Sequence, residues 1–194
     1  MAICSGRTVI ITGAGGGLGR AYALAFAAAG ANVVINDIRA DAAQDVAGEI
    51  RANGGQAIAN SDDITTLATA GRIVEAAVAA FGEVHVLVNN AGVLRDRMFI
   101  SLSEEDWDMV MRVHLKGHYC LANLLGRRWR DLAKAGTPVD ARIINTSSGA
   151  GLQGSVGQSN YSAAKGGIAA LTLVQAAELA RYGITANALA PAAR

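Results

Sequence analysis

RTVIITGAGGGLG, residues 7–19, is the stretch of sequence that decides the fold. Residues 7–12 are short, unbroken and rich in β-branched side chains, as is typical of a strand buried on both faces. The alanine-rich run 18–29, ended by Gly30, predicts a helix directly after the glycines. Glycines between a strand and a helix let bare backbone N–H groups approach a phosphate, and the helix N-terminus adds a partial positive charge. This position favours dinucleotide binding over a plain turn, and the residues predicted to carry it are Gly13, Gly17, Leu18 and Gly19.

Strand-like and helix-like segments alternate along the rest of the chain. Short apolar runs predict further strands at 31–37, 56–59, 84–89, 141–146 and 185–189, and amphipathic runs predict helices at 41–53, 67–81, 103–134 and 160–182. This alternation favours an α/β fold, namely a Rossmann-type doubly wound parallel sheet with helices on both faces. The 194 residues contain no repeat and no linker, so we expect a single dinucleotide-binding domain, 1–194.

Composition and charge exclude several classes of protein. A hydrophobic share of 52% with 17% charged residues suits a buried sheet better than a disordered chain. The net charge is +1 without a basic run, so neither nucleic acid nor a membrane surface is an expected partner. The two cysteines are too far apart in the sequence for a disulfide framework. The three histidines lack cysteine or carboxylate neighbours at ligand spacing, so no metal is expected. No signal peptide opens the chain, and the expected location is cytoplasmic.

Two acidic positions follow predicted strands, where the ligands of such a sheet bind. Asp37 ends the second strand, 18 residues past Gly19, where a carboxylate can accept hydrogen bonds from the adenosine ribose. A 2′-phosphate would meet like charge there, which favours NAD over NADP, although Arg39 could neutralise such a phosphate. Asp63 and Ile64 follow the third strand and are expected beside the adenine. The alternatives are a helix-capping role for Asp37 and a solvated turn at 63–64.

Tyr161 and Lys165 are the candidate catalytic pair. They lie four apart on a predicted helix, and residues at this spacing share a face. A free tyrosine titrates near pH ~10 and is a poor proton donor or acceptor at neutrality. A neighbouring cation favours the ionised phenol and so suits such a pair to acid–base work. Taken alone, the pair has a simpler alternative, because both residues are common on helix surfaces.

Four motifs follow one another in a familiar order: TGAGGGLG at 12–19, NNAG at 89–92, Ser148, and Tyr161-x-x-x-Lys165. Together, over nearly the whole chain, they resemble the short-chain dehydrogenase/reductase family. The segments 19–26, 94–97 and 160–165 are similar, more narrowly, to the (3R)-hydroxyacyl-CoA dehydrogenase portion of type 2 peroxisomal multifunctional enzymes and their bacterial relatives. The resemblance implies an enzyme that interconverts a secondary alcohol and a ketone by NAD(P)-dependent hydride transfer. The implied substrate is a 3-hydroxyacyl-CoA, 3-oxoacyl or steroid-like molecule, and the implied assembly is a homodimer or homotetramer.

The resemblance also implies a role for each site residue. Tyr161 would exchange a proton with the substrate oxygen, and Ser148 would hydrogen-bond that oxygen and stabilise developing charge. Lys165 would hold the nicotinamide ribose. The residues implied to line the cofactor after the fourth strand are Asn90, Ala91 and Gly92, for which a strand-end turn is the alternative.

The chain departs from the family pattern in three places, one of which is Pro191-Ala192, where the family usually has Pro-Gly. His114, in VHLKG at 113–117, stands where the family usually has an asparagine that supports a proton relay. A neutral imidazole can also pass a proton, and a core histidine with a satisfied hydrogen bond is the equal alternative. The sequence ends at Arg194, whereas the family continues through a substrate-covering loop, a further helix and a last strand. We therefore expect the C-terminal part of the fold to be missing, which puts the activity of a 194-residue product in doubt.

A different functional class would fit the same fold. The alternative is a catalytically idle NAD-binding protein with a regulatory or interaction role. It would need a dismantled site, whereas Ser148, Tyr161 and Lys165 are all present. An enzyme is therefore the expected class.

Overall fold

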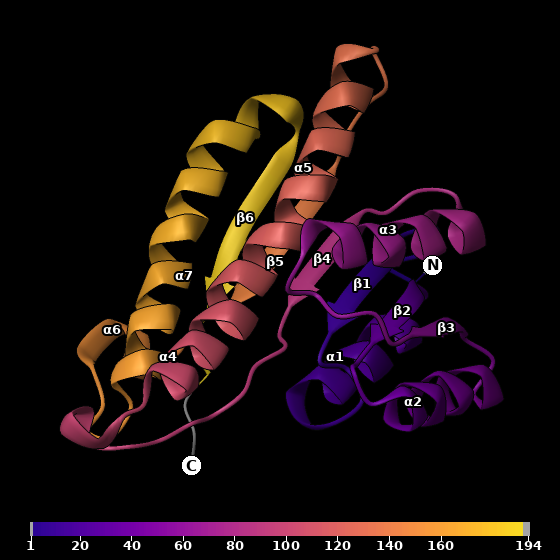
Figure 1. Cartoon of the computed structure of the whole chain (residues 1–194). Helices are drawn as coiled ribbons and strands as arrows, with labels where there is room; N and C mark the ends of the chain where they lie inside the picture. Colours follow the sequence, from indigo (N-terminus) through magenta and orange to yellow (C-terminus); the bar gives the residue numbers. More distant parts are fainter. Residues whose placement is uncertain (1, 192–194) are drawn as a thin grey trace.

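Six parallel strands form one sheet in the order β3-β2-β1-β4-β5-β6 in the computed structural model, which describes residues 2–191 (Figure 1). The strands are β1 (Thr8–Thr12), β2 (Asn32–Asn36), β3 (Gln56–Asn60), β4 (Val86–Asn89), β5 (Ala141–Thr146) and β6 (Ile184–Leu189). The α-helices are α1 (Gly17–Ala28), α2 (Ala40–Ala52), α3 (Leu67–Phe81), α4 (Glu104–Met111), α5 (Gly117–Lys134), α6 (Gly149–Gln153) and α7 (Ser159–Leu179). Two 3-10 turns, η1 (Phe99–Ser101) and η3 (Ala180–Tyr182), and one π-helical segment, η2 (Arg112–Lys116), complete the described elements. The end of the chain at Arg194 lies outside the described residues.

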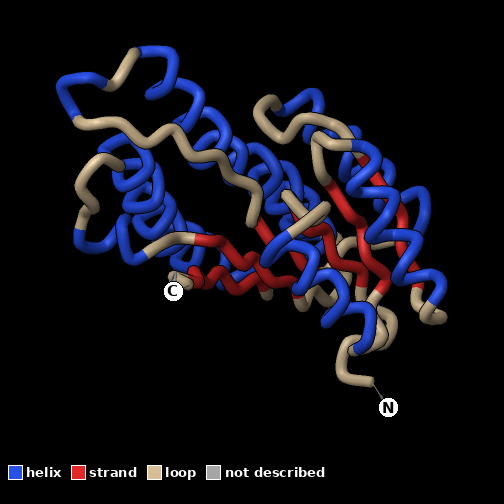
Figure 2. The backbone as a smooth tube through the Cα atoms, turned by 90° about the horizontal axis from the view of Figure 1, so that it is seen from below, coloured by secondary structure: helices blue, strands red, loops and turns tan. Residues whose placement is uncertain are grey.

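The sheet separates two hydrophobic cores. Ile10 of β1 belongs to the core shared with α3 and α5, whereas Val9 and Ile11 belong to the core shared with α1 and α2. Successive side chains of a strand point to opposite faces, which explains this division. All five residues of β1 are buried, and each fully buried aliphatic side chain stabilises the fold by about 2 kcal/mol. Figure 2 shows the strands lying between helices on both sides, so the predicted doubly wound α/β sheet is confirmed.

Buried polar contacts fix α7 to the sheet. The Asn145 side chain on β5 donates from Nδ2 to Thr172 Oγ1 at 2.9 Å and to Gln175 Oε1 at 2.8 Å. Thr172 in turn donates to the Ile168 carbonyl oxygen within the helix, at 2.7 Å. Buried amides and hydroxyls that are satisfied in this way specify one arrangement of neighbouring elements. These bonds pack the middle of α7 against β5, beyond the turns of the helix that carry Tyr161 and Lys165.

The strand order reverses direction between β1 and β4. The chain runs from β1 outward to β2 and β3, and then crosses to β4, β5 and β6 on the other side of β1. At such a switch point the loops after the two central strands diverge and leave a crevice, which is where doubly wound sheets bind ligands. The turn after β1 and the loop after β4 therefore face the same space.

One predicted element is wrong in detail. The sequence predicts a continuous helix over 103–134, but α4 and α5 are separated by η2, which has His114 at its centre. A π turn accommodates an extra residue inside a helix and often occurs at functional sites. The short helix α6, directly after Ser148, is not predicted from the sequence at all. The other predicted strands and helices are present, with small shifts at their ends.

Within residues 2–191, every helix is too short or too polar to cross a membrane.

Candidate active site

The turn after β1 requires glycine at two of its positions. Gly13 has a φ of +62°, a conformation that favours glycine, and a Cβ there would lie 2.8 Å from the Ala91 Cα. Gly19 is buried in the first turn of α1, and a Cβ there would collide with the Gly13 carbonyl oxygen. Gly17 and Leu18 form the start of α1, and Leu18 is half exposed. The turn thus packs backbone against backbone, as a loop that holds a phosphate with its N–H groups requires.

Asp37 is held in place by the backbone on both sides. Its Oδ2 accepts a hydrogen bond from the Gly15 N–H at 3.0 Å, and its Oδ1 accepts one from the Arg39 N–H at 3.0 Å. The Arg39 guanidinium also pairs with this carboxylate, with Nε 3.3 Å from Oδ1. The Asp37 side chain is 8% exposed and that of Arg39 is 66% exposed. The carboxylate is therefore fixed just behind the glycine turn, and the guanidinium of the long Arg39 side chain lies beside it.

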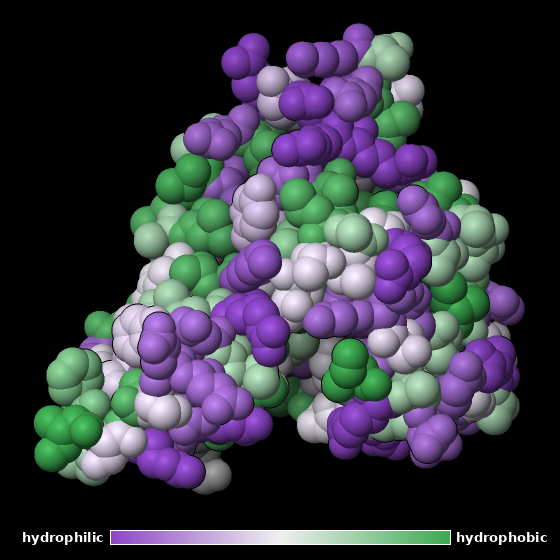
Figure 3. All heavy atoms as spheres, viewed as in Figure 1, coloured by the Kyte–Doolittle hydropathy of each residue, from purple (hydrophilic) through white to green (hydrophobic). Residues whose placement is uncertain are grey.

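A cleft of about 540 Å³ opens at the carboxyl ends of the central strands. Figure 3 shows the surface hollowed at its lower edge, between α4 on one side and α1 and α2 on the other. Met109 of α4 and Val113 of η2 line the cleft on the side away from the sheet. The predicted site residues that line it are Gly13, Asp37, Asp63, Ile64, Asn90, Ala91 and Gly92. A cavity of this size is in the range of small-molecule and cofactor sites.

Asp63 and Ile64 form one wall of the cleft and are also used structurally. The Asp63 carboxylate accepts hydrogen bonds from the Thr65 N–H and from the Thr65 hydroxyl, both at 2.9 Å. Ile64 is 6% exposed and packs so closely on Gly117 that a Cβ there would lie 2.6 Å from Ile64 Cδ1. Ile64 is thus buried, whereas Asp63 is exposed and is ordered by its hydrogen bonds to Thr65.

Thr12 belongs to the glycine motif, but the sequence reasoning gave it no role in the site. This fully buried residue ends β1, and its Oγ1 accepts hydrogen bonds from the N–H groups of Asn90 and Ala91, both at 3.0 Å. The Asn90 side chain donates back to the Thr12 carbonyl oxygen at 3.0 Å. These three bonds hold the loop after β4 against the glycine turn. The signal in the sequence is a hydroxyl residue at the last position of an otherwise apolar strand.

Tyr161 and Lys165 share one face at the start of α7. The Lys165 ammonium lies 5.5 Å from the centroid of the Tyr161 ring. Lys165 is 2% exposed, and its Nζ donates a hydrogen bond to the Thr146 carbonyl oxygen, at the end of β5, at 2.5 Å. The predicted pairing on one helix face is therefore present, and the lysine is anchored to a strand end next to Ser148.

His114 joins the catalytic pair to the cleft. Its ring meets the Tyr161 ring edge-on, with 5.2 Å between centroids and 87° between planes. Its Nε2 lies 2.8 Å from the Val93 carbonyl oxygen and 3.0 Å from the Val93 nitrogen, so either tautomer of the neutral ring finds a partner there. The ring also fills the space over Gly92, where a Cβ would collide with His114 Cε1. His114 therefore positions the loop that lines the cleft and contacts Tyr161 as well.

Burial sets the charge of these two basic groups. Burial lowers the pKa of Lys165 to about 8. Burial, with a smaller effect of the Lys165 charge, lowers the pKa of His114 to about 4. At neutral pH the site therefore contains a protonated lysine and a neutral histidine.

Ser148 lies two residues past the end of β5 and directly before α6. Its Oγ accepts a hydrogen bond from the Ala150 N–H at 3.2 Å and so acts as the helix N-cap. The hydroxyl proton stays available to a ligand, because capping uses only a lone pair of the oxygen. The neighbouring Ser147 is directed inward instead, since its Oγ donates to the Lys165 carbonyl oxygen at 2.9 Å.

Some of the predicted site residues line the cleft, and the others lie outside its lining. Within the described chain, the lining of the 540 Å³ cleft does not include Gly17, Leu18, Gly19, Ser148, Tyr161 or Lys165. The first three lie in the glycine turn and α1, and the last three lie around α6 and the start of α7. His114 bridges the second group to the cleft through Val93.

The family model for short chain dehydrogenases matches this chain over residues 7–193. Hydroxyacyl-CoA dehydrogenase ChsB1 of Mycobacterium tuberculosis is 49% identical over 98% of this chain and 62% of its own length. Peroxisomal multifunctional enzyme type 2 of Mus musculus is 45% identical over 96% of this chain, but this match covers only 25% of the mouse protein. A 3-oxoacyl-[acyl-carrier-protein] reductase of Synechocystis is 38% identical over 98% of this chain and 75% of its own length.

A solved structure supports the same assignment. The crystal structure of a short chain dehydrogenase from Mycobacterium avium superimposes with a TM-score of 0.97 and 57% sequence identity, over 99% of this chain and 69% of that one. This chain therefore spans about two thirds or less of several of the relatives that it matches. The match of both sequence and fold over nearly all of the chain leads to one conclusion: the chain belongs to the short-chain dehydrogenase family.

Proposed function

We propose that this chain is a single dinucleotide-binding and catalytic domain that interconverts a secondary alcohol and a ketone with NAD(H). The observation that carries the proposal is the buried Lys165 ammonium, which lies 5.5 Å from the Tyr161 ring centroid. Burying a charged lysine costs free energy unless the ammonium group interacts with a partner. Here it lies beside an acid–base candidate, and His114 connects that candidate to a cleft of cofactor size.

The residues around the cleft fit a nicotinamide dinucleotide. Family members use NAD(P), and the tightly packed glycine turn leaves backbone N–H groups for the phosphates. We propose that Gly13, Gly17, Leu18 and Gly19 hold the phosphates and that Asp63 and Ile64 flank the adenine. Asn90, Ala91 and Gly92 would line the remainder. When bound, the cofactor supplies the nicotinamide carbon that exchanges a hydride with the substrate.

Asp37 supports NAD as the cofactor rather than NADP. Its carboxylate is fixed behind the glycine turn by two backbone N–H groups, where it can accept hydrogen bonds from ribose hydroxyls. A 2′-phosphate at this position would meet a negative charge. The Arg39 guanidinium is the only charge near enough to offset that repulsion among the contacts described, and it is already paired with Asp37.

Tyr161, Lys165 and Ser148 would divide the proton chemistry. Tyr161 would take the hydroxyl proton from an alcohol, or return it to a ketone oxygen. The Lys165 charge, present below its pKa of about 8, would stabilise negative charge that develops on the phenol oxygen, and its ammonium would also hold the nicotinamide ribose. The Ser148 hydroxyl would donate to the reacting oxygen while its lone pair caps α6.

His114 would complete a path for the proton. Its ring is neutral at pH 7, because its pKa is lowered to about 4 by burial. Nδ1 is buried without a hydrogen-bond partner in the described part of the chain, whereas Nε2 contacts Val93. A neutral imidazole can accept a proton at one nitrogen and release one from the other. We propose that His114 takes the place of the relay asparagine that the family usually has here.

The substrate proposal rests on the named relatives. A hydroxyacyl-CoA dehydrogenase and a 3-oxoacyl reductase share 49% and 38% identity with this chain. A 3-hydroxyacyl-CoA or 3-oxoacyl thioester, or a steroid-like alcohol, is therefore the proposed substrate class. Arg95 and Arg97 are exposed on the loop after β4 and would be the candidates to bind CoA phosphates, of which Arg95 also pairs with Asp106 at 3.6 Å.

Self-association is also part of the proposal. α5 and α7 lie beside each other and expose apolar side chains, among them Tyr119, Leu173 and Val174. Exposed apolar side chains on adjacent helices suit burial against a second copy of the chain. A homodimer or homotetramer would cover them. The cytoplasmic location stays a prediction from the sequence.

The decisive experiment is a substrate panel on the full-length protein. Purified protein is given 3-hydroxyacyl-CoA thioesters and hydroxysteroids with NAD⁺ or NADP⁺, and reduced cofactor is followed at 340 nm. We expect turnover with NAD⁺, and we expect Tyr161→Phe to lower kcat by at least about 100-fold while NADH binding is largely kept. Unchanged turnover in Tyr161→Phe would remove this residue from the mechanism. NADH binding without turnover of any substrate would favour the idle NAD-binding alternative.

A further inference from the structure

Asn160 is a fully buried amide whose two polar atoms are both used. It is 0% exposed and lies in the first turn of α7, directly before Tyr161. Its Nδ2 donates to the Arg95 carbonyl oxygen at 3.1 Å and to the Asp106 carbonyl oxygen at 3.3 Å. Its Oδ1 accepts a hydrogen bond from the Tyr161 N–H at 2.7 Å. One side chain thus joins three separate segments of the chain.

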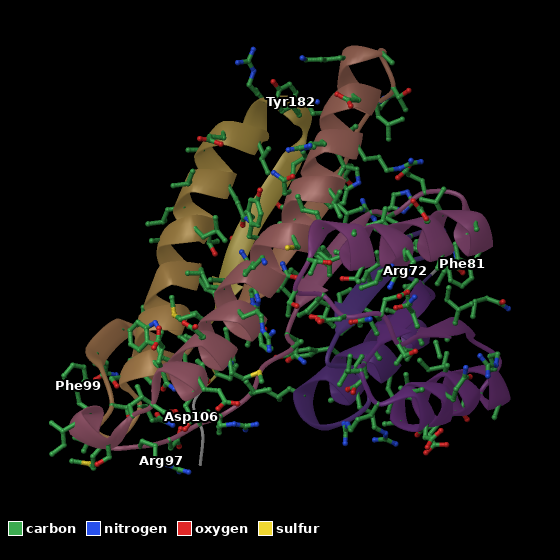
Figure 4. The ribbon with its side chains drawn as sticks, in the orientation of Figure 1. Arg72, Phe81, Arg97, Phe99, Asp106 and Tyr182 are labelled. Carbon is green, nitrogen blue, oxygen red and sulfur yellow. The ribbon has the colours of Figure 1, made fainter. Side chains whose placement is uncertain are left out.

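Two of the partners of Asn160 come from elements that also contribute residues to the cleft lining, the loop after β4 and α4. Arg95 belongs to the loop after β4, a few residues past the part of that loop that lines the cleft. Asp106 lies in the first turn of α4, and Figure 4 shows it beside the loop that carries Arg97 and Phe99. Asn160 therefore ties the start of the catalytic helix to the same loop that His114 holds at Val93.

The chemistry of this junction requires an amide. The single buried side chain at this position must donate to two carbonyl oxygens and accept a hydrogen bond from one backbone N–H. Asparagine offers an NH₂ group with two donors and a carbonyl oxygen. A carboxylate would bring negative charge against two carbonyl oxygens, and an alanine would remove all three hydrogen bonds. The start of a helix does not by itself require these three contacts, because α7 could begin with any ordinary N-cap residue.

We propose that Asn160 is a positioning residue, which fixes the Tyr161 phenol relative to the loop after β4. The proposal deepens the proposed function and rests on it, because it assigns Tyr161 the acid–base step. Reaction rates are sensitive to placement, and a shift of about 1 Å in a reacting group can cost about 100-fold. The side-chain hydrogen bonds of Asn160 reach neither a residue of the cleft lining nor a catalytic side chain, so it acts through the backbone of Tyr161.

The test compares Asn160→Ala with Thr172→Ala, a matched control on the same helix. Thr172 is also buried and also hydrogen-bonded through its side chain, but it lies twelve residues further along α7. We expect Asn160→Ala to lower kcat by tenfold to about 100-fold, with a change in KM for NAD⁺ below about threefold. Thr172→Ala should keep kcat within about twofold, although it loses stability. Equal losses of kcat in both variants, after correction for the folded fraction, would overturn the proposal.

Asn160→Asp gives a second test if the alanine variant folds poorly. This side chain keeps the shape and the acceptor, and on protonation it regains one donor. We expect its kcat, relative to that of the unsubstituted protein, to rise as the pH falls through the range in which the carboxylate takes up a proton. A ratio that does not change with pH would contradict the proposed contacts.

A measurement without turnover separates this proposal from the proposed function. The chain has four tyrosines, so protein labelled with 3-fluorotyrosine gives few ¹⁹F signals, and Tyr161→Phe identifies the one from Tyr161. We expect Asn160→Ala to shift or broaden this signal and Thr172→Ala to leave it in place. If the unsubstituted protein turns over no substrate, the proposed function fails, and the ¹⁹F signal still decides the positioning role. An unmoved Tyr161 signal in Asn160→Ala would refute that role.

Discussion

His114→Asn should change how the stability of the protein depends on pH. In the folded chain His114 is 2% exposed, and burial lowers its pKa from 6.5 to about 4. Between these two values the unfolded chain binds a proton at this position and the folded chain does not. The free energy of unfolding therefore falls as the pH is lowered from 6.5 to 4, and below pH 4 this contribution stops changing. Asparagine has no such proton, so the variant lacks this part of the acid sensitivity.

The magnitude follows from the size of the pKa change. At about 1.4 kcal/mol per pKa unit, the change from 6.5 to about 4 corresponds to about 3 kcal/mol. Urea unfolding of both proteins, followed by the fluorescence of the buried Trp129, would be measured from pH 7.5 to pH 4 at constant ionic strength. The difference in unfolding free energy between the two proteins should shift by about 3 kcal/mol across this range, against the unsubstituted protein at low pH. A loss of packing in the asparagine variant lowers its unfolding free energy equally at every pH. It therefore does not affect how the difference between the two proteins changes with pH.

The control for this experiment is His85→Gln. His85 accepts the Thr8 N–H at 3.0 Å through Nδ1, and its pKa is also lowered, mainly by burial. Because its ring is partly exposed, its substitution should give a change of the same sign but smaller size. A difference between His114→Asn and the unsubstituted protein that stays constant from pH 7.5 to pH 4 would refute the reasoning. His114 would then not be held as a buried neutral ring.

Two further substitutions test the cofactor side of the site. Asp37→Ala should weaken NADH binding by about tenfold and leave NADPH binding unchanged or improved, because it removes the ribose acceptor and the negative charge together. Fluorescence titration with both cofactors measures the two affinities. An unchanged preference for NADH would show that Asp37 does not select NAD. Gly19→Ala should weaken NADH binding at least about tenfold, because the added Cβ collides with the Gly13 carbonyl oxygen and must displace the turn; Gly48→Ala is the control, since a Cβ at that helical glycine meets no atom within 4 Å, and equal binding by both variants would contradict the tight packing of the turn.

The fold was predictable because its signals are local. The apolar run of β1, the glycines after it and the spacing of later apolar runs each depend on a few neighbouring residues, and the sheet has the predicted elements in the predicted order. The contact between Tyr161 and Lys165 was predictable for the same reason, since both lie on one helix. What the sequence could not reveal depends on contacts between distant segments. Thr12 is hydrogen-bonded to residues 90 and 91, and Asn160 is hydrogen-bonded to Arg95 and Asp106. The periodicity of the sequence does not predict contacts between such distant residues.

The π-helical segment escaped prediction for a different reason. One extra residue in a turn changes the apolar pattern of a long helix very little, so 103–134 reads as a single amphipathic run. Its effect lies in the orientation of His114. That residue faces Val93 and Tyr161 from the centre of η2, which explains why the structure was needed to relate it to the site.

η2 also lets the sequence of this long helix contain one residue more than its geometry requires. A π turn takes up that residue within one turn, so α4 and α5 keep nearly the orientation of a continuous helix. Loss of one residue from 112–116 would therefore restore a regular helix and leave Met109 and the Asp106 carbonyl oxygen near their present places. Its effect would fall on η2 itself, because the His114 ring would no longer lie between Val93 and Tyr161. A single-residue deletion in this part of the chain would thus disturb the site through one side chain and keep the helices that surround it.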